Sequence, residues 1–282
     1  MVRVFTEDTH VQHVRNWIFV SCYVSQSDSD FEEVKLGSEM ATKQLTLIVV
    51  RHGQATHNLD TFQRKDLVLT DEPDRPIMNS PLTELGRQQA YLVANRLADT
   101  KFHLGFASDL TRASDTAQAI VAANPSLDDV KECRFLRERN AGIFEGDHDL
   151  LKAQCTVEYA IEDRDLLTWR IPEGDSIVDL RERVQAGINL VQAEALALEV
   201  ENPTILLASH YVWMHELYHI LSEISVTLGD EKRAAKPRTP NTGVDRYILT
   251  TRCREEGGKP ELEKIVFDLV SCGRHLDAVS SY

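Results

Sequence analysis

The sequence has few cysteines and no long apolar segment that would suggest a membrane span. Its 282 residues include 5 cysteines, and no two of them form a Cys-x-x-Cys pair. An odd, widely spaced set of this kind excludes a secreted disulfide framework and a zinc ribbon. The longest early apolar run, Trp17 to Val24, is far too short to cross a bilayer. These absences predict a cytoplasmic protein without a membrane partner.

Basic residues are also scarce. The chain has 31 Lys and Arg against 45 Asp and Glu, a formal net charge of −14. Nucleic acids and anionic bilayers are gripped by basic patches, so neither is expected as a partner. A local cluster of arginine and histidine can still hold a phosphate inside an acidic protein. The 42% of hydrophobic residues excludes wholesale disorder.

The first 44 residues differ from the remainder. The polar segment Ser25–Asp30 follows the early apolar run, and a mostly acidic stretch continues to Glu39. We therefore expect residues 1–44 to be an N-terminal extension, possibly poorly ordered, and residues 45–282 to be the main domain.

From residue 45 onward, candidate strands alternate with candidate helices. Leu45–Val50 and Thr204–Ser209 are continuous apolar runs, typical of strands buried on both faces, and His103–Ser108 is a shorter candidate. Helices are expected over Thr111–Ala123, over Val212–Ile224, and after the capping box Ser176 to Asp179. This alternation predicts an α/β fold, a three-layer sandwich with a mainly parallel central sheet.

Two further elements complete the expected fold. Thr83 is a good N-cap, and the helix after it should turn Leu85, Leu92, Val93 and Leu97 towards the core. Arg246–Cys253 and Lys264–Val270, joined through Gly257-Gly258, are expected to form a hairpin. The hairpin would add an antiparallel edge to the sheet.

Cationic side chains follow three of the expected strands. Leu45–Val50 leads into Arg51-His52-Gly53, His103–Ser108 precedes Arg112, and Thr204–Ser209 ends at His210. Ligands of open parallel sheets bind beyond the carboxyl ends of the strands. Two arginines and two histidines at that edge would form a compact pocket for a tetrahedral dianion.

These residues resemble a known family. Arg51-His52-Gly53-Gln-Ala-Thr-His-Asn58 is similar to the Arg-His-Gly-x-x-x-x-Asn signature of the histidine phosphatase superfamily, the phosphoglycerate mutase-like fold. Later segments agree in order: the helix start at Leu82-Thr83, the segment around Arg112, Leu136-Arg-Glu138 with Gly142 and Gly146, Pro172 to Ser176, and Ala208-Ser-His210. The resemblance spans roughly residues 45–270.

The resemblance implies a role for each matching residue. It implies that His52 is the nucleophile that forms a phosphohistidine, and that Arg51, Arg112 and His210 bind the phosphoryl oxygens. Asn58 would add a neutral donor. Glu138 would protonate the leaving oxygen and then deprotonate the attacking water. Neither a metal ion nor a cofactor is implied.

Several nearby residues have a plainer interpretation. Glu138 lies among arginines, so a surface ion pair is its alternative role, and Glu145 is a weaker candidate for the acid. We interpret His57 as a wall residue. Tyr211 stands where the family usually has glycine, and should either narrow the pocket or turn outward. Ala55 replaces the serine or threonine of many relatives.

A competing motif occurs later in the chain. His215-Glu216-Leu-Tyr-His219 matches the His-Glu-x-x-His pattern of zinc peptidases. The extended form of that pattern fails, because Ser222 and Ser225 stand where glycine and a third histidine belong. We therefore disfavour a zinc metallopeptidase and interpret both histidines as structural or exposed.

The branch of the family is predicted from charge. Mutases of the family carry an arginine-rich stretch after the acid loop, whereas Asp147–Arg170 here is mostly acidic. That surface would repel a highly charged bisphosphate. The expected function is hydrolysis of a small-molecule phosphomonoester. The alternatives are a phosphoglycerate mutase-type phosphoryl transferase and a non-catalytic phosphate-binding module with residues 1–44 as its partner segment.

Overall fold

A computed structural model of the chain describes residues 42–72, 76–160, 167–252 and 261–278. Within these ranges a 6-stranded sheet has the order β3-β2-β4-β1-β5-β6. The strands are β1 (Thr42–Arg51), β2 (Leu104–Ala107), β3 (Lys131–Glu132), β4 (Thr204–Ser209), β5 (Val244–Arg252) and β6 (Glu261–Cys272).

The sheet is parallel on one side and antiparallel on the other. β1 pairs with β4, β4 with β2, and β2 with β3, all in parallel. β5 runs antiparallel to both β1 and β6. The expected hairpin is therefore present and adds the antiparallel edge, although its Gly257-Gly258 turn lies outside the described residues.

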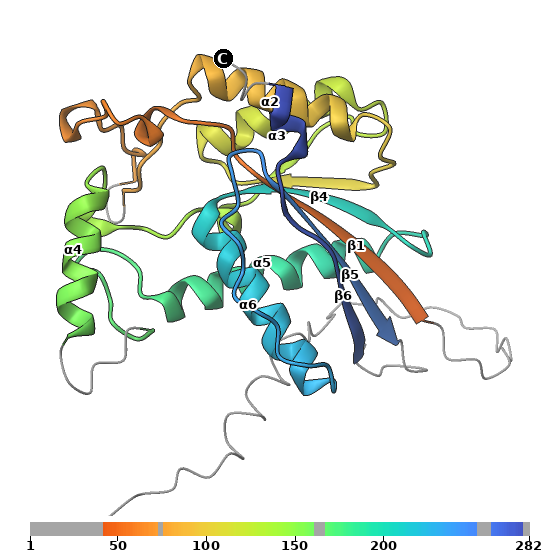
Figure 1. Ribbon diagram of the computed structural model, residues 1–282. Coiled ribbons are helices and arrows are strands. Elements are labelled where there is room, and N and C mark those ends of the chain that lie inside the picture. The colour runs from red at the N-terminus through yellow and green to blue at the C-terminus, as the bar shows by residue number, and fades with distance from the viewer. Residues whose placement is uncertain (1–41, 73–75, 161–166, 253–260, 279–282) are drawn as a thin grey trace, which may run out of the picture.

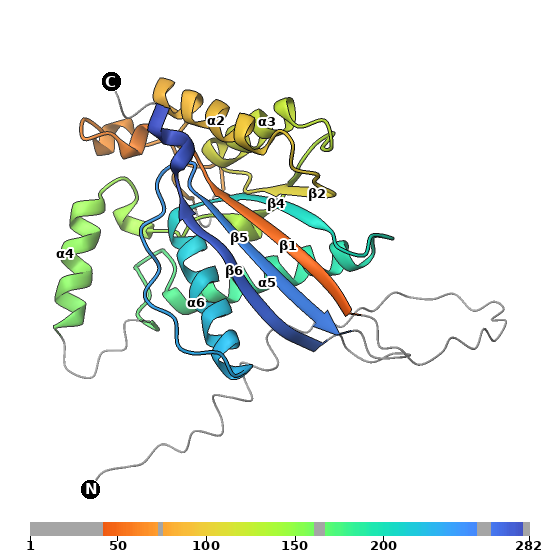
Figure 2. The same cartoon turned by 45° about the vertical axis from the view of Figure 1, so that its right-hand side comes forward.

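Helices cover both faces of the sheet. Figures 1 and 2 show α2 (Glu84–Leu97) and α3 (Thr111–Ala123) on one face, and α5 (Ile177–Leu196) and α6 (Tyr211–Thr227) on the other. The three-layer α/β sandwich predicted from the sequence is confirmed. α4 (His148–Tyr159) lies to one side of the layers.

The two central strands divide their side chains between two cores. Leu47 and Val49 of β1 belong to the cluster with α5 and α6, whereas Ile48 and Val50 belong to the cluster with α2 and α3. β4 alternates in the same way. Because both faces are covered, the strands are apolar at successive positions, which is why they appear in the sequence as continuous apolar runs.

The helix after Thr83 begins as expected and turns Val93 and Leu97 inward, but Leu85 lies outside the buried stripe. The Thr83 hydroxyl accepts a hydrogen bond from the Gly86 N–H, and the buried stripe is Gly86, Ala90, Val93, Ala94 and Leu97. Leu85, expected in the apolar face, is 37% exposed. Gly86 explains the difference, because a Cβ there would lie 1.9 Å from the Gln54 carbonyl oxygen. The main chain of α2 at Gly86 therefore packs directly against the main chain of the loop after β1.

Other boundaries follow the local sequence signals. α3 has the expected bounds, and Ser176 caps α5 by accepting from the Asp179 N–H. The acidic segment Asp147–Arg170 begins with a helix, α4, which is capped by the Asp147 carboxylate through a hydrogen bond accepted from the Leu150 N–H. Short 3-10 turns cover Thr56–Asn58 (η1), Arg64–Asp66 (η2), Arg134–Leu136 (η3), Gly142–Phe144 (η4) and Arg274–Ala278 (η5).

The proposed extension lies almost entirely outside the described residues. β1 starts at Thr42, so the last three residues of the range 1–44 already pair with β5. The division at residue 44 stays a prediction. Among the described residues, no helix combines the length and the apolar character that crossing a membrane requires.

Candidate active site

Two histidines meet at the carboxyl ends of β1 and β4. Arg51 is paired with Ser209 across the two strands, and the next N–H, that of His52, donates to the Ser209 carbonyl oxygen at 3.0 Å. His210 follows β4 directly and is the N-cap of α6. The rings of His52 and His210 therefore lie close, with centroids 5.2 Å apart.

The imidazole of His52 is fixed in one tautomer. Its Nδ1 lies 2.7 Å from the Gly53 carbonyl oxygen, so Nδ1 carries the proton and Nε2 carries the free electron pair. The side chain is buried, at 2% exposure. This burial, followed by the charges of Arg112 and Arg51, lowers the pKa of His52 well below its usual range. The ring is thus neutral at pH 7.

The loop that carries His52 is locked to both helices on its side of the sheet. A Cβ on Gly53 would lie 2.5 Å from the Gly86 carbonyl oxygen, so α2 fits against glycine alone. The Gly53 N–H donates to the hydroxyl of Thr116, at 3.0 Å, and that hydroxyl donates to the Arg112 carbonyl oxygen at 2.7 Å. Loop position and helix position are thereby coupled.

Two buried arginines flank His52. Arg51 is 9% exposed and Arg112 is 1% exposed. One guanidinium nitrogen of Arg51 donates to the Thr239 carbonyl oxygen, and one of Arg112 donates to the Met78 carbonyl oxygen, each at 2.8 Å. The Nε of each arginine is buried without a hydrogen-bond partner among the described residues. Burial lowers the pKa of both Arg51 and Arg112 to about 10, so both remain cations at pH 7.

His210 is the most deeply placed of the expected site residues. It is fully buried, and its Nε2 lies 2.9 Å from the Ser108 hydroxyl oxygen. The Ser108 oxygen also accepts from the Leu110 N–H at 3.3 Å, and the Nδ1 of His210 is buried without a hydrogen-bond partner among the described residues. Burial, together with Arg112 and His52, lowers the pKa of His210 well below its usual range.

Glu138 is held by two main-chain donors. One carboxylate oxygen accepts from the Arg139 N–H at 2.9 Å, and the other accepts from the Val212 N–H at 3.1 Å. Val212 lies in the first turn of α6, where N–H groups point outward and favour a negative charge. The carboxylate is therefore oriented by its own loop and by α6, rather than held in a surface ion pair.

Glu145 is a second carboxylate in the same region. It is 5% exposed and accepts a hydrogen bond of 2.8 Å from the Ala141 N–H. Burial raises the pKa of Glu145 to about 7, although this N–H and the charge of Arg112 act in the opposite direction. Glu145 is thus partly protonated at neutral pH.

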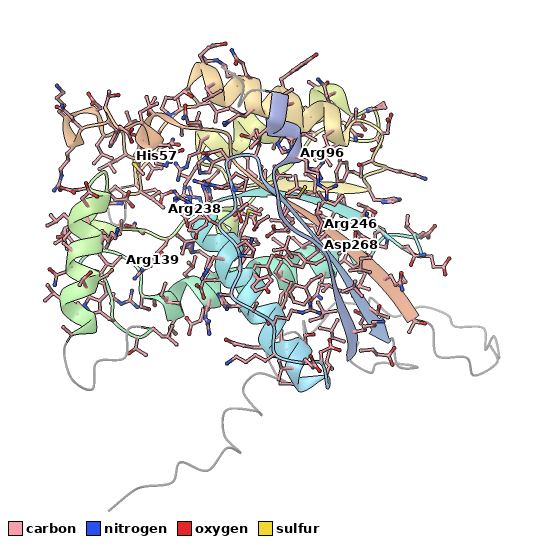
Figure 3. The ribbon with its side chains drawn as sticks, in the orientation of Figure 1. His57, Arg96, Arg139, Arg238, Arg246 and Asp268 are labelled. Carbon is pink, nitrogen blue, oxygen red and sulfur yellow. The ribbon has the colours of Figure 1, made fainter. Side chains whose placement is uncertain are left out.

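These side chains surround one cavity of about 910 Å³. Arg51, His52, Asn58, Arg112, Glu138 and Glu145 line it, whereas His210 is not among its lining residues. The labelled side chains of His57, Arg139 and Arg238 lie on the same side of the molecule, next to α4, in Figure 3. Asp60, Asp147 and Asp149 also line the cavity. The pocket is therefore cationic around His52 and carries acidic groups from the surrounding loops.

The remaining predicted residues can now be placed. Asn58 lines the cavity, but its side-chain oxygen Oδ1 accepts a hydrogen bond of 3.0 Å from the Ala55 N–H. Only its side-chain Nδ2 is therefore suited to contact an anion. His57 lines the wall, as interpreted from the sequence. Tyr211 also faces the cavity, with the Arg51 guanidinium 5.3 Å from its ring centroid, and thus narrows it. Ala55 is fully buried against Leu82.

Sequence reasoning missed the segment from Lys236 to Gly243. The Thr242 N–H and the Asn241 side chain both donate to the His52 carbonyl oxygen, at 3.1 and 3.2 Å, and the Arg51 N–H donates to the Gly243 carbonyl oxygen. Arg238 lines the cavity. The segment has neither helical nor strand periodicity, so only its turn residues Asn241-Thr242-Gly243 offered a signal.

The zinc-peptidase motif lies outside this cavity. Glu216, which would be the general base of such an enzyme, is instead paired with Arg181 at 2.8 Å. No group of three or more His, Cys, Asp or Glu residues is arranged to hold a metal within the described ranges. A catalytic zinc centre needs three protein ligands and an open position. The disfavoured peptidase interpretation therefore gains no support.

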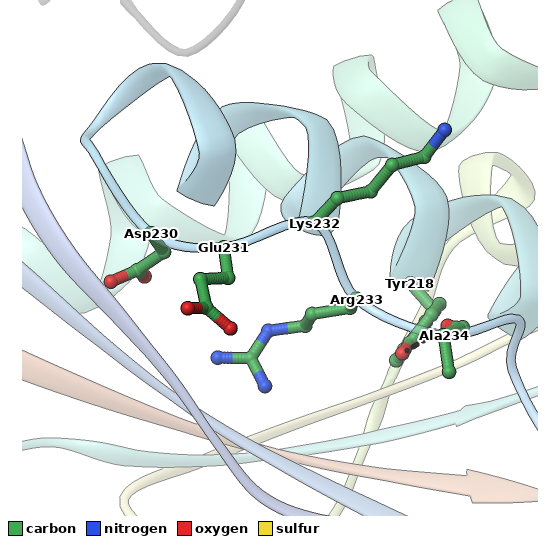
Figure 4. Close-up of a pocket in the computed structure, with 6 residues that line it drawn as sticks. All are labelled: Tyr218, Asp230, Glu231, Lys232, Arg233 and Ala234. Atoms are coloured by element: carbon green, nitrogen blue, oxygen red, sulfur yellow. Dashed lines mark hydrogen bonds between the residues drawn. The ribbon is translucent and has the colours of Figure 1, made fainter.

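A second cavity, of about 520 Å³, follows the end of α6 (Figure 4). It is lined by Tyr218 and by residues 230–234, which carry both charge signs. Of its two cationic side chains, Lys232 and Arg233, the Arg233 guanidinium packs on an aromatic ring, 3.9 Å from the ring centroid of Phe267. The Tyr218 hydroxyl donates to the Ala234 carbonyl oxygen. This cavity has no arrangement suited to catalysis.

The sequence matches a known family and several of its members. Residues 47–236 match the histidine phosphatase superfamily, branch 1. Fructose-2,6-bisphosphatase TIGAR of Xenopus tropicalis is 25% identical over 284 residues, covering 85% of this chain and 98% of that protein. The 2,3-bisphosphoglycerate-dependent phosphoglycerate mutase 2 of Gloeobacter violaceus is 35% identical over 138 residues, 47% of this chain and 57% of that protein.

Solved structures share the fold. Phosphoglycerate mutase from Bacillus anthracis superposes with a TM-score of 0.61 at 20% identity, covering 84% of this chain and 96% of that one. A mycobacterial glucosyl-3-phosphoglycerate phosphatase in complex with VO3 gives a TM-score of 0.52 at 25% identity, covering 72% and 92%. Relatives thus include both phosphatases and mutases.

Proposed function

The chain belongs to the histidine phosphatase superfamily, and on this basis we propose that it hydrolyses a small-molecule phosphomonoester through a phosphohistidine on His52. The observation that carries the proposal is the state of that side chain. Its Nδ1–H is donated to the Gly53 carbonyl oxygen, its ring is neutral, and two buried arginines flank it. A neutral imidazole held in this tautomer presents Nε2 as a nucleophile.

The first step transfers the phosphoryl group to the enzyme. The Nε2 electron pair of His52 attacks phosphorus, an N–P bond forms, and the P–O bond to the leaving group breaks with its electron pair on oxygen. Glu138 gives its proton to that oxygen, so the product alcohol leaves neutral.

The second step regenerates the enzyme. Glu138, now a carboxylate, removes a proton from water, whose oxygen attacks phosphorus. The N–P bond breaks and its electron pair returns to His52 Nε2. Inorganic phosphate leaves, and Glu138 is protonated again for the next cycle.

The cationic groups stabilise the charge on the transferring phosphoryl oxygens. The buried Nε donors of Arg51 and Arg112, and the Nδ1–H of His210, are the donors we assign to these oxygens. Asn58 would add its Nδ2. Donors already fixed in a buried site stabilise a developing anion without reorganising, which is usually the largest contribution to catalysis of this kind.

The acid is assigned to Glu138 because two main-chain N–H groups orient it at the cavity wall. Glu145 is the second candidate, because burial raises the pKa of its carboxyl to about 7 and makes it a proton donor at neutral pH. The two assignments predict different variants as inactive.

The acidic loop residues favour a phosphatase over a mutase. Asp60, Asp147 and Asp149 line the outer cavity and would repel a substrate with a second strongly anionic group. A mutase-type transferase remains the enzymatic alternative, favoured by the 35% identity to the Gloeobacter violaceus mutase over part of the chain. A cytoplasmic location and the absence of nucleic-acid partners stay predictions from composition.

The deciding experiment is a panel of phosphomonoesters tested with wild-type protein, His52→Ala and Glu138→Gln. We expect turnover to be lost in the first variant and strongly reduced in the second, with labelled phosphate trapped on the chain only when His52 is present. Hydrolysis of no member of the panel by the wild type would contradict the proposal. Conversion of a phosphoglycerate isomer without release of phosphate would favour the mutase.

A further inference from the structure

Two histidines of the unused His-Glu-x-x-His motif face each other on α6. His215 and His219 are one helical turn apart, and their ring centroids are separated by 4.4 Å. Their Nε2 atoms lie 3.3 Å from each other. Neither residue lines the cavity that holds His52, so the pair is independent of the proposed phosphatase chemistry.

The orientation of His215 is set by a carboxylate. Its Nδ1 lies 3.1 Å from a Glu216 oxygen, and the other Glu216 oxygen accepts a hydrogen bond of 2.8 Å from Arg181 Nε. The Glu216 side chain is 7% exposed. An anionic acceptor at Nδ1 places the imidazole proton there and leaves the electron pair on Nε2, as in carboxylate–histidine–metal arrangements.

The separation of the two Nε2 atoms matches that of two ligands of one ion. Zinc–imidazole bonds are about 2.0–2.1 Å long, so two nitrogens at tetrahedral or right angles around one ion lie roughly 2.8–3.4 Å apart. The observed 3.3 Å falls within that interval. A single proton shared between the two nitrogens gives a similar distance, and an ion would replace it.

We propose that His215 and His219 form a binding site for one divalent transition-metal ion, Zn²⁺ in the first instance, with Nε2 of each imidazole as a ligand. On binding, the single ring proton of His219 would move from Nε2 to Nδ1 by exchange with water, so that both Nε2 atoms offer an electron pair to the ion. Water would complete the coordination, because no third metal-ligating side chain joins the pair among the described residues. The site is accordingly weaker than a closed four-ligand zinc site.

The ion would lie next to a wall of the candidate active site. The ring centroid of Tyr211 lies 6.2 Å from that of His215, and the Arg51 guanidinium lies 5.3 Å from the same Tyr211 centroid. An ion bound by both imidazoles would also cross-link the turn of α6 between His215 and His219. Neither imidazole, however, contacts the groups to which we assign catalysis.

The test is titration of the metal-free full chain with ZnCl₂ in a buffer without phosphate, by calorimetry, for wild type, His215→Ala, His219→Ala and His219→Gln. The chain has 10 histidines, so the comparison between proteins, rather than total binding, is decisive. We expect the wild type to bind one more ion than each variant. Glu216→Gln should retain that ion with about tenfold weaker affinity, since it removes only the outer partner of His215.

Glu223→Gln is the matched control, because it changes an exposed carboxylate one turn further along α6 and keeps both imidazoles. It should bind as the wild type does. Melting curves without metal identify any variant that unfolds, and His219→Gln preserves polarity if the alanine variant fails. Equal stoichiometry and affinity of zinc binding in the wild type, His215→Ala and His219→Ala would overturn the proposal. Loss of the ion in Glu223→Gln would overturn it as well. Phosphatase activity without added metal should be the same in the wild type and His219→Gln.

Discussion

The Val212 N–H donates a hydrogen bond of 3.1 Å to the carboxylate of Glu138, so the candidate acid is held by the first turn of the helix that begins after His210. The second histidine and the acid are thereby positioned by the same end of α6. The carboxyl group is thereby oriented for the proton transfers that the proposed mechanism assigns to Glu138.

We predict that Glu138→Gln lowers kcat by about 100- to 10,000-fold, the usual contribution of a general acid–base group. Glutamine keeps the acceptor oxygen but cannot transfer a proton. Rapid-quench experiments with labelled substrate should show phosphohistidine accumulating in this variant when the leaving group needs no acid. Glu145→Gln is the comparison, and a larger loss there than in Glu138→Gln would move the acid role to Glu145.

Arg112→Lys should lower kcat/KM by about 100-fold, because lysine retains the charge but loses the guanidinium fork that reaches both the Met78 carbonyl oxygen and an anion. Steady-state kinetics with the best substrate of the panel measures the loss. Arg87→Lys is a suitable control, since Arg87 forms an exposed ion pair with Glu84. Equal kinetics in wild type and Arg112→Lys would exclude Arg112 from the site.

Stability should fall as the pH is lowered below about 6.5. Burial lowers the pKa of His52 and of His210 well below the ordinary histidine value of 6.5, so the unfolded chain takes up protons at a higher pH than the folded chain does. Each histidine contributes a limiting slope of about 1.4 kcal/mol per pH unit, in the direction of lower stability at lower pH. Urea unfolding between pH 7 and 5 measures the slope, which should be shallower in His210→Gln.

Ionisation of Glu145 should have the opposite effect on the pH dependence of stability, between about pH 4.5 and 7. Its folded pKa of about 7 exceeds the ordinary glutamate value of 4.5, so its contribution to stability is complete below pH 4.5 and is lost as the pH rises to 7. The loss is of the order of 3 kcal/mol. Glu145→Gln should therefore gain stability relative to the wild type between pH 4.5 and 7. A constant difference over that range would contradict the raised pKa.

Gly86→Ala should destabilise the protein by about 1–3 kcal/mol, the usual range for overpacking. Its Cβ would lie 1.9 Å from the Gln54 carbonyl oxygen, so either α2 or the loop carrying His52 has to move. Chemical denaturation measures the loss of stability, and kcat reports any displacement of the loop that carries His52. The nearby exposed Gln88→Ala leaves the contact intact and should change neither.

The sequence predicted the elements whose signals are local. α3 and β4 have the expected bounds because helical composition and an unbroken apolar run are both local features of the sequence, and the Ser176 cap is equally local. The convergence of His52, Arg112 and His210 was predicted because parallel strands bring their carboxyl ends to one edge. Leu85 was assigned wrongly because the close contact between Gly86 and Gln54 joins distant segments.

The groups that complete the site also depend on contacts between segments far apart in the sequence, so the sequence did not predict them. Thr239 acts on Arg51 through its main-chain oxygen, and any residue type offers that atom. Lys236 and Asp245 form a fully buried ion pair next to Thr239, yet both have the appearance of surface charges in the sequence. The pKa of Glu145 depends on burial, which the sequence around it does not reveal.

The bond between Arg51 and Thr239 joins residues 188 positions apart in the chain. A ribosome builds the chain from its N-terminus, so Arg51 and His52 leave the exit tunnel long before the segment that holds them. The residues that match the superfamily's branch 1, 47–236, end ahead of Thr239, Asn241 and Gly243. A nascent chain that has completed β4 and α6 would thus have every assigned catalytic side chain and still lack the backbone that fixes the nucleophile. Activity should therefore appear only after residues 239–243 have been synthesised and have packed against Arg51 and His52.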